Sequence, residues 1–186
     1  ITDRADIDSW SQADNPTLRL VRAMTVACLA EPALNAWFDG EKRLLHGHID
    51  LAIAVDTPDG LFAPVLRAVD AGGDLSARIS ELKAAVEERR IDPAALRGAT
   101  ITLSNFGMLG GEFAQLVVTP PQVAILGAGR IGLACLPQDG HPALRQVMPL
   151  SLTFDHRVVD GADGALFMRD LVRYLEDPKL QLLGSL

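Results

Sequence analysis

An apolar run that ends in a cluster of ionisable residues constrains the fold of this chain more than any other feature. Residues 148–154, MPLSLTF, have the continuous apolar pattern of a buried strand. The run stops at four ionisable residues: Asp155, His156, Arg157 and Asp160. Two glycines, Gly161 and Gly164, then lead into residues 165–176, whose apolar spacing is that of a helix. The chain must therefore pass from a strand to a helix through a short polar junction.

His156 stands at this junction in the position of a catalytic base. A histidine changes its charge near neutral pH, and the carboxylate of Asp160 follows four residues later. The alternative is a capped junction in which His156 only forms a structural hydrogen bond, because structural sites use the same residue types. The spacing alone leaves both interpretations open.

The remaining chain alternates between strand and helix patterns. Strands are expected at residues 1–7, 36–38, 43–45, 49–56, 61–66, 99–104, 117–118, 123–126 and 145–154. Helices are expected at residues 17–31, 74–90 and 165–176, with capping signals at residues 14–16 and at Asp74. This order predicts an α/β fold with a mixed sheet and about three helices.

The composition is that of a globular protein and excludes several partners. Hydrophobic residues make up 48% and charged residues 22% of the 186 residues. The net charge of −7 argues against a nucleic acid or an anionic membrane as partner, and no apolar window reaches the ~18 residues that a membrane span requires. Cys28 and Cys135 both lie in apolar surroundings. We therefore expect buried, reduced thiols and a location in a bacterial cytoplasm or a mitochondrial matrix.

Residues 127–132, GAGRIG, match the glycine pattern of a dinucleotide-binding site and follow the apolar residues 123–126. Such a site needs a helix that begins at the glycines, so that free backbone amides meet the pyrophosphate. Pro137, Gly140 and Pro142 leave no room for that helix. We therefore interpret the glycines as points of close backbone approach in a strand.

Residues 46–50, HGHID, would place His46, His48 and Asp50 on one face of a strand, where they could meet a zinc ion. A metal site would need a further ligand, and His141 has no obvious companion. We favour exposed histidines on an edge strand and expect no metal site.

Ser104 ends an expected strand, but its neighbours, TLSNF, do not form the G-x-S-x-G elbow of a serine hydrolase. It is therefore a poor candidate for a nucleophile. Its hydroxyl could still donate to a developing oxyanion, with the attacking thiol or alcohol supplied by the substrate.

Five stretches together resemble one protein family. DHRVVDG, residues 155–161, is similar to the D-H-R-x-x-D-G signature of the acyltransferase (E2) catalytic domains of 2-oxo acid dehydrogenase complexes. The other four stretches occur in the order of that family: LNA at 34–36, IAVDTPDGL at 53–61, TLSNFGMLGG at 102–111 and PPQVAILGAGRI at 120–131. Together they span nearly the whole chain, which makes the resemblance far more specific than H-x-x-x-D-G alone.

The resemblance implies a chloramphenicol-acetyltransferase-like fold, a mixed sheet with flanking helices, in a single catalytic domain over residues 1–186. It also implies acyl transfer between the dihydrolipoamide thiol and coenzyme A, in a channel between neighbouring subunits. His156 matches the general base of the family, and Asp160 matches an acidic position that supports this histidine. Ser104 matches the hydroxyl that stabilises the oxyanion, and it comes from the adjacent subunit. Four further residues match the two motifs: Asp155, Arg157, Gly161 and Asn105.

The same resemblance implies a homotrimer, which can assemble into a 24-mer core, and partners that carry the lipoyl group and the E1 and E3 activities. The N-terminal edge and the lipoyl and subunit-binding domains of the family are absent from this sequence, so we expect the lipoyl substrate on a separate domain. Residues 9–15 are fewer than the family usually has at this place. The apolar residues 181–186, QLLGSL, are expected to pack against a neighbouring subunit.

Two other functions are compatible with the same scaffold, namely a non-catalytic core subunit and an acyltransferase that acts on a small-molecule alcohol. The presence of His156, Asp160 and Ser104 together argues against the first, because a purely structural subunit does not need all three. TLSNFGMLGG and PPQVAILGAGRI argue against the second, since they resemble the complex-forming family specifically. The motifs assign no coenzyme A-binding residue, and they do not decide between branched-chain and acetyl groups.

Overall fold

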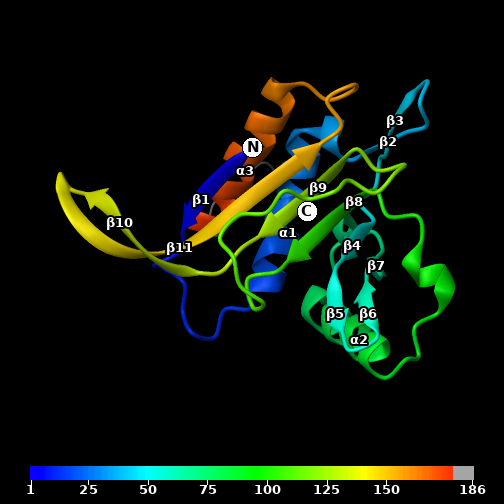
Figure 1. Ribbon diagram of the computed structural model, residues 1–186, viewed down its shortest axis with the longest axis horizontal. Coiled ribbons are helices and arrows are strands. Elements are labelled where there is room, and N and C mark those ends of the chain that lie inside the picture. The colour runs from blue at the N-terminus through cyan, green and yellow to red at the C-terminus, as the bar shows by residue number, and fades with distance from the viewer. Residues whose placement is uncertain (178–186) are drawn as a thin grey trace.

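Seven strands form the central sheet of the computed structural model, which describes residues 1–177 (Figure 1). Their order is β1 (Thr2–Asp6), β11 (His141–Phe154), β9 (Ala124–Ala128), β8 (Ile101–Asn105), β4 (Leu51–Ile53) and β7 (Val65–Leu66), and β10 (Gly132–Gln138) pairs with β11 beside this row. β8 is parallel to both β9 and β4, and the other neighbours are antiparallel. The sheet is mixed, as the sequence predicts. Residues 181–186, which we expect to contact a neighbour, lie outside the described residues.

The helices begin where the sequence places capping residues. In α1 (Pro16–Ala30) the side chain of Asn15 accepts a hydrogen bond from the Leu18 amide, and in α2 (Leu75–Glu87) Asp74 accepts one from the Ala77 amide. α3 (Gly161–Glu176) is the third α-helix, and three short 3-10 helices complete the set within residues 1–177: η1 (Pro32–Leu34), η2 (Val69–Ala71) and η3 (Pro93–Leu96). Among residues 1–177, no helix has both the length and the apolar character needed to cross a bilayer.

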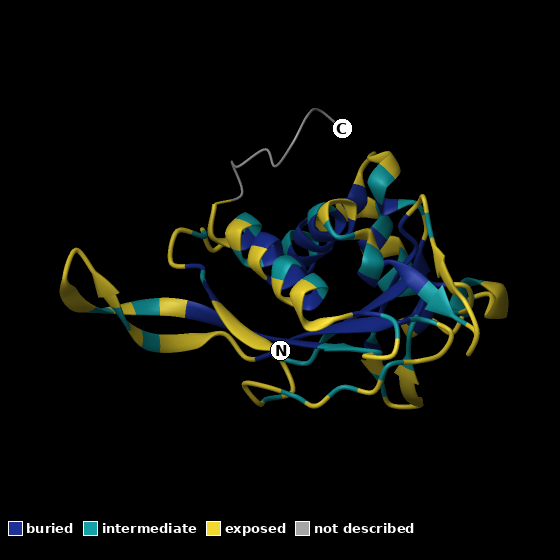
Figure 2. Ribbon diagram, turned by 90° about the horizontal axis from the view of Figure 1, so that it is seen from above, coloured by how far each residue is buried: buried dark blue, intermediate teal, exposed yellow. Residues whose placement is uncertain are grey.

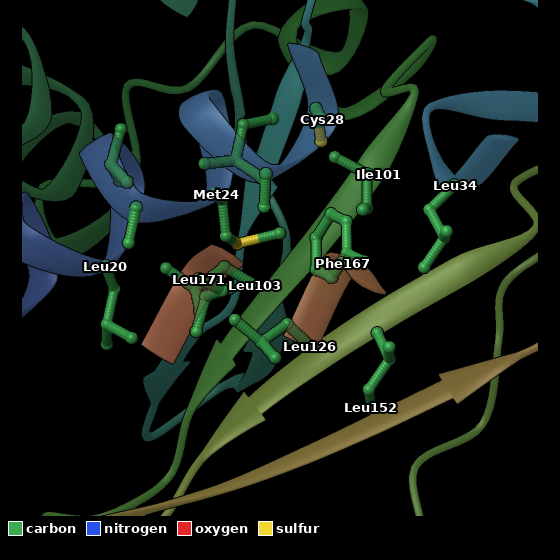
Figure 3. Packing of buried hydrophobic residues seen from close by; sticks show 14 of the residues in the cluster. Leu20, Met24, Cys28, Leu34, Ile101, Leu103, Leu126, Leu152, Phe167 and Leu171 are labelled. Atoms are coloured by element: carbon green, nitrogen blue, oxygen red, sulfur yellow. The ribbon is translucent and has the colours of Figure 1, made fainter. Parts of the chain in front are cut away.

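Side-chain alternation along the strands gives the sheet two different faces. Leu103 on β8 and Leu126 on β9 point to the face that α1 and α3 cover, and they are fully buried there. Met24 from α1 and Phe167 from α3 pack between these strands and the helices (Figure 3). Figure 2 shows the helices on this one side of the sheet. The opposite face carries no α-helix within residues 1–177 and presents both polar and apolar strand residues, among them Ser104 and Ile125.

Two small hairpins form separate two-stranded sheets beside the central one. β2 (Ala36–Phe38) pairs with β3 (Arg43–Leu45) around the expected turn at Asp39 and Gly40, and β5 (Val55–Thr57) pairs with β6 (Gly60–Phe62). The expected strands at residues 49–56 and 61–66 are each divided in two. Their inner parts, β4 and β7, belong to the central sheet, and their outer parts form the separate β5–β6 ribbon.

Several sequence-based expectations are wrong in detail. Residues 117–118 form no strand, because the chain from 106 to 121 crosses the open face of the sheet, where the Ala114 amide donates to Ser151 Oγ. α2 ends at Glu87 rather than at residue 90, since Arg89 has a φ of 57° that a helix does not allow. β10 was not expected, and α3 begins four residues earlier than its apolar pattern indicates.

The two cysteines differ in environment. Cys28 is buried in α1, and burial raises the pKa of its thiol, so it stays protonated. Cys135 is exposed, which contradicts the expectation of a buried thiol. It lies on β10, which pairs only with β11 in a hairpin that projects from the rest of the sheet (Figure 1). An apolar sequence context therefore does not bury a residue where no second layer covers the strand.

The glycines of GAGRIG serve close backbone approach, as expected, and no helix follows them. A Cβ on Gly129 would lie 1.9 Å from the carbonyl oxygen of Glu112, and a Cβ on Gly127 would lie 2.7 Å from Leu116. Both glycines therefore let the crossing chain of residues 106–121 lie directly on the sheet. Gly132, at the end of the same motif, has no atom within 4 Å of its Cβ position.

We predict that Gly129→Ala lowers the free energy of unfolding by about 1–3 kcal/mol, because the new methyl group must displace backbone. Gly132→Ala is the matched control from the same motif and should unfold like the wild type. Urea unfolding followed by circular dichroism measures both. Equal stability of the two variants would contradict the close approach at Gly129.

Candidate active site

The junction between β11 and α3 is a tight turn that is fixed to the body of the protein at its start. The Asp155 amide donates to the Val123 carbonyl at 2.8 Å, just before β9. Within the turn, the amides of Val158 and Val159 both donate to the Asp155 carbonyl, at 3.1 and 3.0 Å. Val159 is buried, whereas His156 is exposed. The sequence Asp155 to Asp160 thus forms a turn that presents His156 to the outside.

Asp155 and Arg157 form a two-point ion pair on either side of His156. Arg157 Nε lies 2.9 Å from Asp155 Oδ1, and Arg157 Nη2 lies 2.6 Å from Asp155 Oδ2. The hydrogen bonds from Arg157 lower the pKa of the Asp155 carboxyl, so the pair stays charged at neutral pH. On its other side, the Arg157 guanidinium lies 4.8 Å from the centre of the Phe38 ring.

Asp160 initiates α3. Its carboxylate accepts hydrogen bonds from the amides of Ala162 and Asp163, at 2.8 and 2.9 Å, and Asp163 accepts one from the Asp160 amide. This reciprocal pattern is a capping box. Gly161 is the first residue of the helix. Asp160 therefore fixes the helix that leaves the turn, and within residues 1–177 it makes no hydrogen bond to His156.

His156 itself is free to act on a ligand. Its ring contacts the Phe154 ring at a centroid distance of 5.6 Å, and neither ring nitrogen has a hydrogen-bond partner within residues 1–177. The side chain lines an open pocket of about 320 Å³ together with Arg43, Asp160 and Asp163. His156 thus forms no structural hydrogen bond within the described chain, which argues against a purely structural role at the junction.

Ser104 lies on the open face of the sheet, beside a cavity of about 570 Å³. The cavity wall is largely apolar and includes Ala52, Ala54, Trp37, Leu116 and Ile125. Ser104 Oγ has no hydrogen-bond partner in the described part of the chain, so its hydroxyl is available to a ligand. An unpaired hydroxyl beside an apolar cavity is suited to donate to a developing negative charge.

One polar pair interrupts this apolar wall. Thr102, two residues before Ser104 and on the same face of β8, donates from Oγ1 to Gln122 Oε1 at 2.6 Å. Asn105, the next residue after Ser104, points to the other face and lines a separate cavity with Gly107 and Met148. The structure therefore separates Asn105 from the Ser104 cavity.

Ser104 and His156 do not meet within one chain. Ser104 pairs with Gly127 on β9, and Gly127 pairs with Ser151 on β11, so the two serines are level and two strand spacings apart, roughly 10 Å. Phe154 lies three residues beyond Ser151, roughly another 10 Å along β11, and His156 follows it. The chain thus carries two separate half-sites.

The residues of HGHID do not form a strand, yet their side chains lie close together. His48 Nε2 lies 3.6 Å from Asp50 Oδ2, and the rings of His46 and His48 are 5.7 Å apart. His46 packs edge-on against Trp37 at 4.7 Å, and burial, followed by the charge of His48, lowers the pKa of His46. Burial disfavours the charged form of Asp50, but hydrogen bonds from the Ala68 amide and from Arg67 outweigh this and lower its pKa. In residues 1–177, no group of three His, Cys, Asp or Glu side chains is placed to hold a metal ion.

Sequence reasoning missed five residues that shape the two half-sites: Trp37, Phe38, Arg43, Thr102 and Gln122. Thr102 could have been found from Ser104, because residues two apart on a strand share a face. The other four reach their positions through contacts between segments far apart in the sequence, for which no local pattern exists.

Known proteins resemble this chain over most of its length. The sequence model of the family described as "2-oxoacid dehydrogenases acyltransferase (catalytic domain)" matches residues 11–183. The lipoamide acyltransferase component of a branched-chain alpha-keto acid dehydrogenase complex from Pseudomonas putida is 40% identical over 163 residues, which are 86% of this chain and 38% of that protein. A dihydrolipoyllysine-residue acetyltransferase component of a pyruvate dehydrogenase complex from Staphylococcus epidermidis is 38% identical over 168 residues, 88% of this chain and 39% of that protein. The chain thus spans about two-fifths of the length of these relatives.

Solved structures agree with this resemblance. The dihydrolipoamide acetyltransferase of Azotobacter vinelandii superposes with a TM-score of 0.90 at 30% identity, over 98% of this chain and 83% of that one. Its crystallographic and enzymatic study concerns the role of a serine, a histidine and an asparagine in the catalytic mechanism. A chloramphenicol acetyltransferase superposes with a TM-score of 0.61 at 18% identity, over 94% of this chain and 86% of that one. The fold is thus chloramphenicol-acetyltransferase-like, as the sequence predicts.

We predict that Asp160→Ala destabilises the protein by about 1 kcal/mol, because two amides at the start of α3 lose their acceptor. Asp160→Asn should retain nearly full stability, since an asparagine oxygen accepts the same bonds. Chemical unfolding of both variants measures the difference. An Asp160→Ala protein as stable as the wild type would show that the capping box contributes nothing.

Proposed function

The chain belongs to the family of 2-oxoacid dehydrogenase acyltransferase catalytic domains, and on this basis we propose that it transfers an acyl group between the dihydrolipoyl thiol and coenzyme A. The observation that carries the proposal is that each half-site presents one polar side chain without a hydrogen-bond partner. The imidazole of His156 and the hydroxyl of Ser104 each lack a partner within the described residues. The chemistry of thiol-to-thiol acyl transfer needs one base and one hydrogen-bond donor.

The spacing of these residues supports the same roles. In the Azotobacter vinelandii enzyme, the serine stands 52 positions before the histidine, and the asparagine stands four positions after it. Ser104 and His156 are separated by the same interval, and Asp160 stands four positions after His156. An asparagine can accept the helix-capping bonds that Asp160 accepts here, which fits a structural role for this position.

The proposed mechanism requires only these side chains. His156 removes the proton from the attacking thiol, which is mostly protonated at neutral pH because a thiol has a usual pKa of about 8.5. The resulting thiolate adds to the thioester carbonyl, and Ser104 donates a hydrogen bond to the oxygen that becomes negative. A donor of this kind stabilises such an oxyanion by about 3 kcal/mol. When the carbonyl re-forms and the second thiolate leaves, His156 returns the proton to it.

We propose that each complete site combines His156 of one chain with Ser104 of a neighbouring chain, in a homotrimer that can build a 24-mer core. The separation of the two half-sites supports this arrangement. The projecting β10–β11 hairpin also exposes Leu133 and Leu144, which are 69% and 70% accessible in one chain and are suited to an interface. A lipoyl domain and E1 and E3 components are the partners that we propose for such a core.

The cavity beside Ser104 is compatible with a slender thiol-bearing arm, since its wall is mostly apolar and its polar groups are few. We propose that this cavity receives one of the two thiol substrates, with an acyl group of the branched-chain or acetyl type. A compartment that keeps thiols reduced, either a bacterial cytoplasm or a mitochondrial matrix, remains the proposed location.

The first functional prediction concerns the two half-sites separately. His156→Ala should lower kcat for transfer from acyl-CoA to free dihydrolipoamide by about 100-fold or more, and Ser104→Ala by about 100-fold. Thioester formation on dihydrolipoamide measures both, with acetyl- and isobutyryl-CoA compared side by side. Wild-type rates no higher than those of His156→Ala would favour a non-catalytic core subunit.

The second functional prediction concerns the shared site. Ser104→Ala chains and His156→Ala chains, dissociated and reassembled together, should regain activity, because some interfaces then combine an intact His156 with an intact Ser104. Each variant reassembled alone is the control and should stay inactive. Mixed assemblies that remain inactive, although sedimentation shows that they form, would contradict a site between chains.

A further inference from the structure

The turn that carries His156 needs an external support. The ion pair of Asp155 and Arg157 is local to the turn, so it moves with the turn and cannot fix His156 relative to the rest of the protein. The imidazole has no hydrogen bond of its own within residues 1–177. The position of the base must therefore come from contacts between the turn and another part of the chain.

The β2–β3 hairpin supplies such contacts on the exposed side of the turn. The Phe38 ring lies 4.8 Å from the Arg157 guanidinium carbon, and Arg43 Nη1 donates a hydrogen bond to the Val158 carbonyl. Phe38 is on β2 and Arg43 is its partner on β3, so one rung of the hairpin makes both contacts. Arg43 also lines the pocket that contains His156.

The hairpin is in turn anchored in the protein body. The Phe38 amide donates to the Pro121 carbonyl at 2.7 Å, and Trp37 Nε1 donates to the Ala99 carbonyl at 2.8 Å. The Val123 amide donates to the Ala36 carbonyl, and the Val123 carbonyl accepts from Asp155. The base of the hairpin and the start of the turn are thus attached to the same residue of the sheet.

We propose that the β2–β3 hairpin sets the position of His156, and that Phe38 and Arg43 are positioning residues of the acyltransferase reaction. This inference rests on the proposed function only for its kinetic consequence. Neither residue touches a reacting atom. Phe38 holds Arg157 and Arg43 holds the Val158 carbonyl, so together they fix the turn at two points besides its attachment to Val123.

Neighbouring side chains of β2 serve different half-sites. Trp37 lines the cavity beside Ser104, whereas Phe38 contacts the turn of His156. In the proposed assembly these half-sites belong to two different complete sites. An effect of Phe38 should therefore appear only at the site that uses His156 of the same chain.

Kinetics of the assembled enzyme test the proposal. Phe38→Leu keeps an apolar side chain but removes the ring, and Arg43→Ala removes the donor to Val158. Each should lower kcat by about tenfold to a hundredfold, because the base is misplaced. Phe38→Leu should do so with little change in KM, since Phe38 does not line the pocket of His156. Phe38→Tyr, which keeps the ring, should restore kcat, and Lys42→Ala at the turn of the same hairpin is the control. A lower melting temperature with unchanged kcat would overturn the proposal.

Mixed assemblies locate the effect. Phe38→Leu in the Ser104→Ala chain, which supplies His156, should lower the regained activity, whereas Phe38→Leu in the His156→Ala chain should not. Equal effects in both chains would overturn the proposal. If the mixture without Phe38→Leu regains no activity, the proposed site between chains is wrong. In that case, the kcat of the protein that carries Phe38→Leu in every chain tests whether the hairpin positions His156.

Hydrogen–deuterium exchange gives a result that does not depend on catalysis. The amides of Val158 and Val159 should exchange faster in Phe38→Leu and Arg43→Ala than in Lys42→Ala, since the turn loses its support. Unchanged exchange would overturn the proposal even for a protein without acyltransferase activity. If the wild type has no acyltransferase activity but the two variants still exchange faster than it does, the hairpin contacts are supported and only the proposed function is contradicted.

Discussion

The pairing of β9 with β8 on one side and β11 on the other is the constraint on which the rest of the structure depends. β9 is buried along its whole length. Near one end of β9, Gly127 is level with Ser104. Just before its other end, the Val123 carbonyl accepts the backbone hydrogen bond that starts the His156 turn. The parallel pair with β8 and the antiparallel pair with β11 cannot shift without reversing which side chains face the helices. The distance between the half-sites is therefore as firmly set as the core itself.

The sequence predicts the features that have a local cause. The strand, polar junction and helix around His156, the caps at Asn15 and Asp74, and the glycines of close approach all follow from residue types at short spacing. β10 is not predicted because its apolar residues 133–136 do not alternate with polar ones and are followed at once by Pro137. An apolar sequence pattern thus predicts a strand reliably only where helices or other chain segments cover that strand.

The candidate site shows the same limit. His156 and Ser104 can be recognised from their motifs, and their placement in separate half-sites follows from the register of three strands, which the sequence does not reveal. Asp160 was expected to support the histidine, and in the structure its bonds are made to the start of α3. The contacts of Phe38 and Arg43 join segments more than a hundred residues apart. Such contacts depend on the finished fold, so no local signal could indicate them.

The separation of Ser104 from His156 has a consequence for the protein before it is assembled. A newly made chain in the proposed arrangement holds a base without an oxyanion donor and a donor without a base. It can therefore do little to a thioester that it meets, because neither group alone stabilises the transition state as the pair does. In the proposed arrangement, assembly itself would therefore activate the catalyst, and unassembled chains would not hydrolyse the thioesters that they meet.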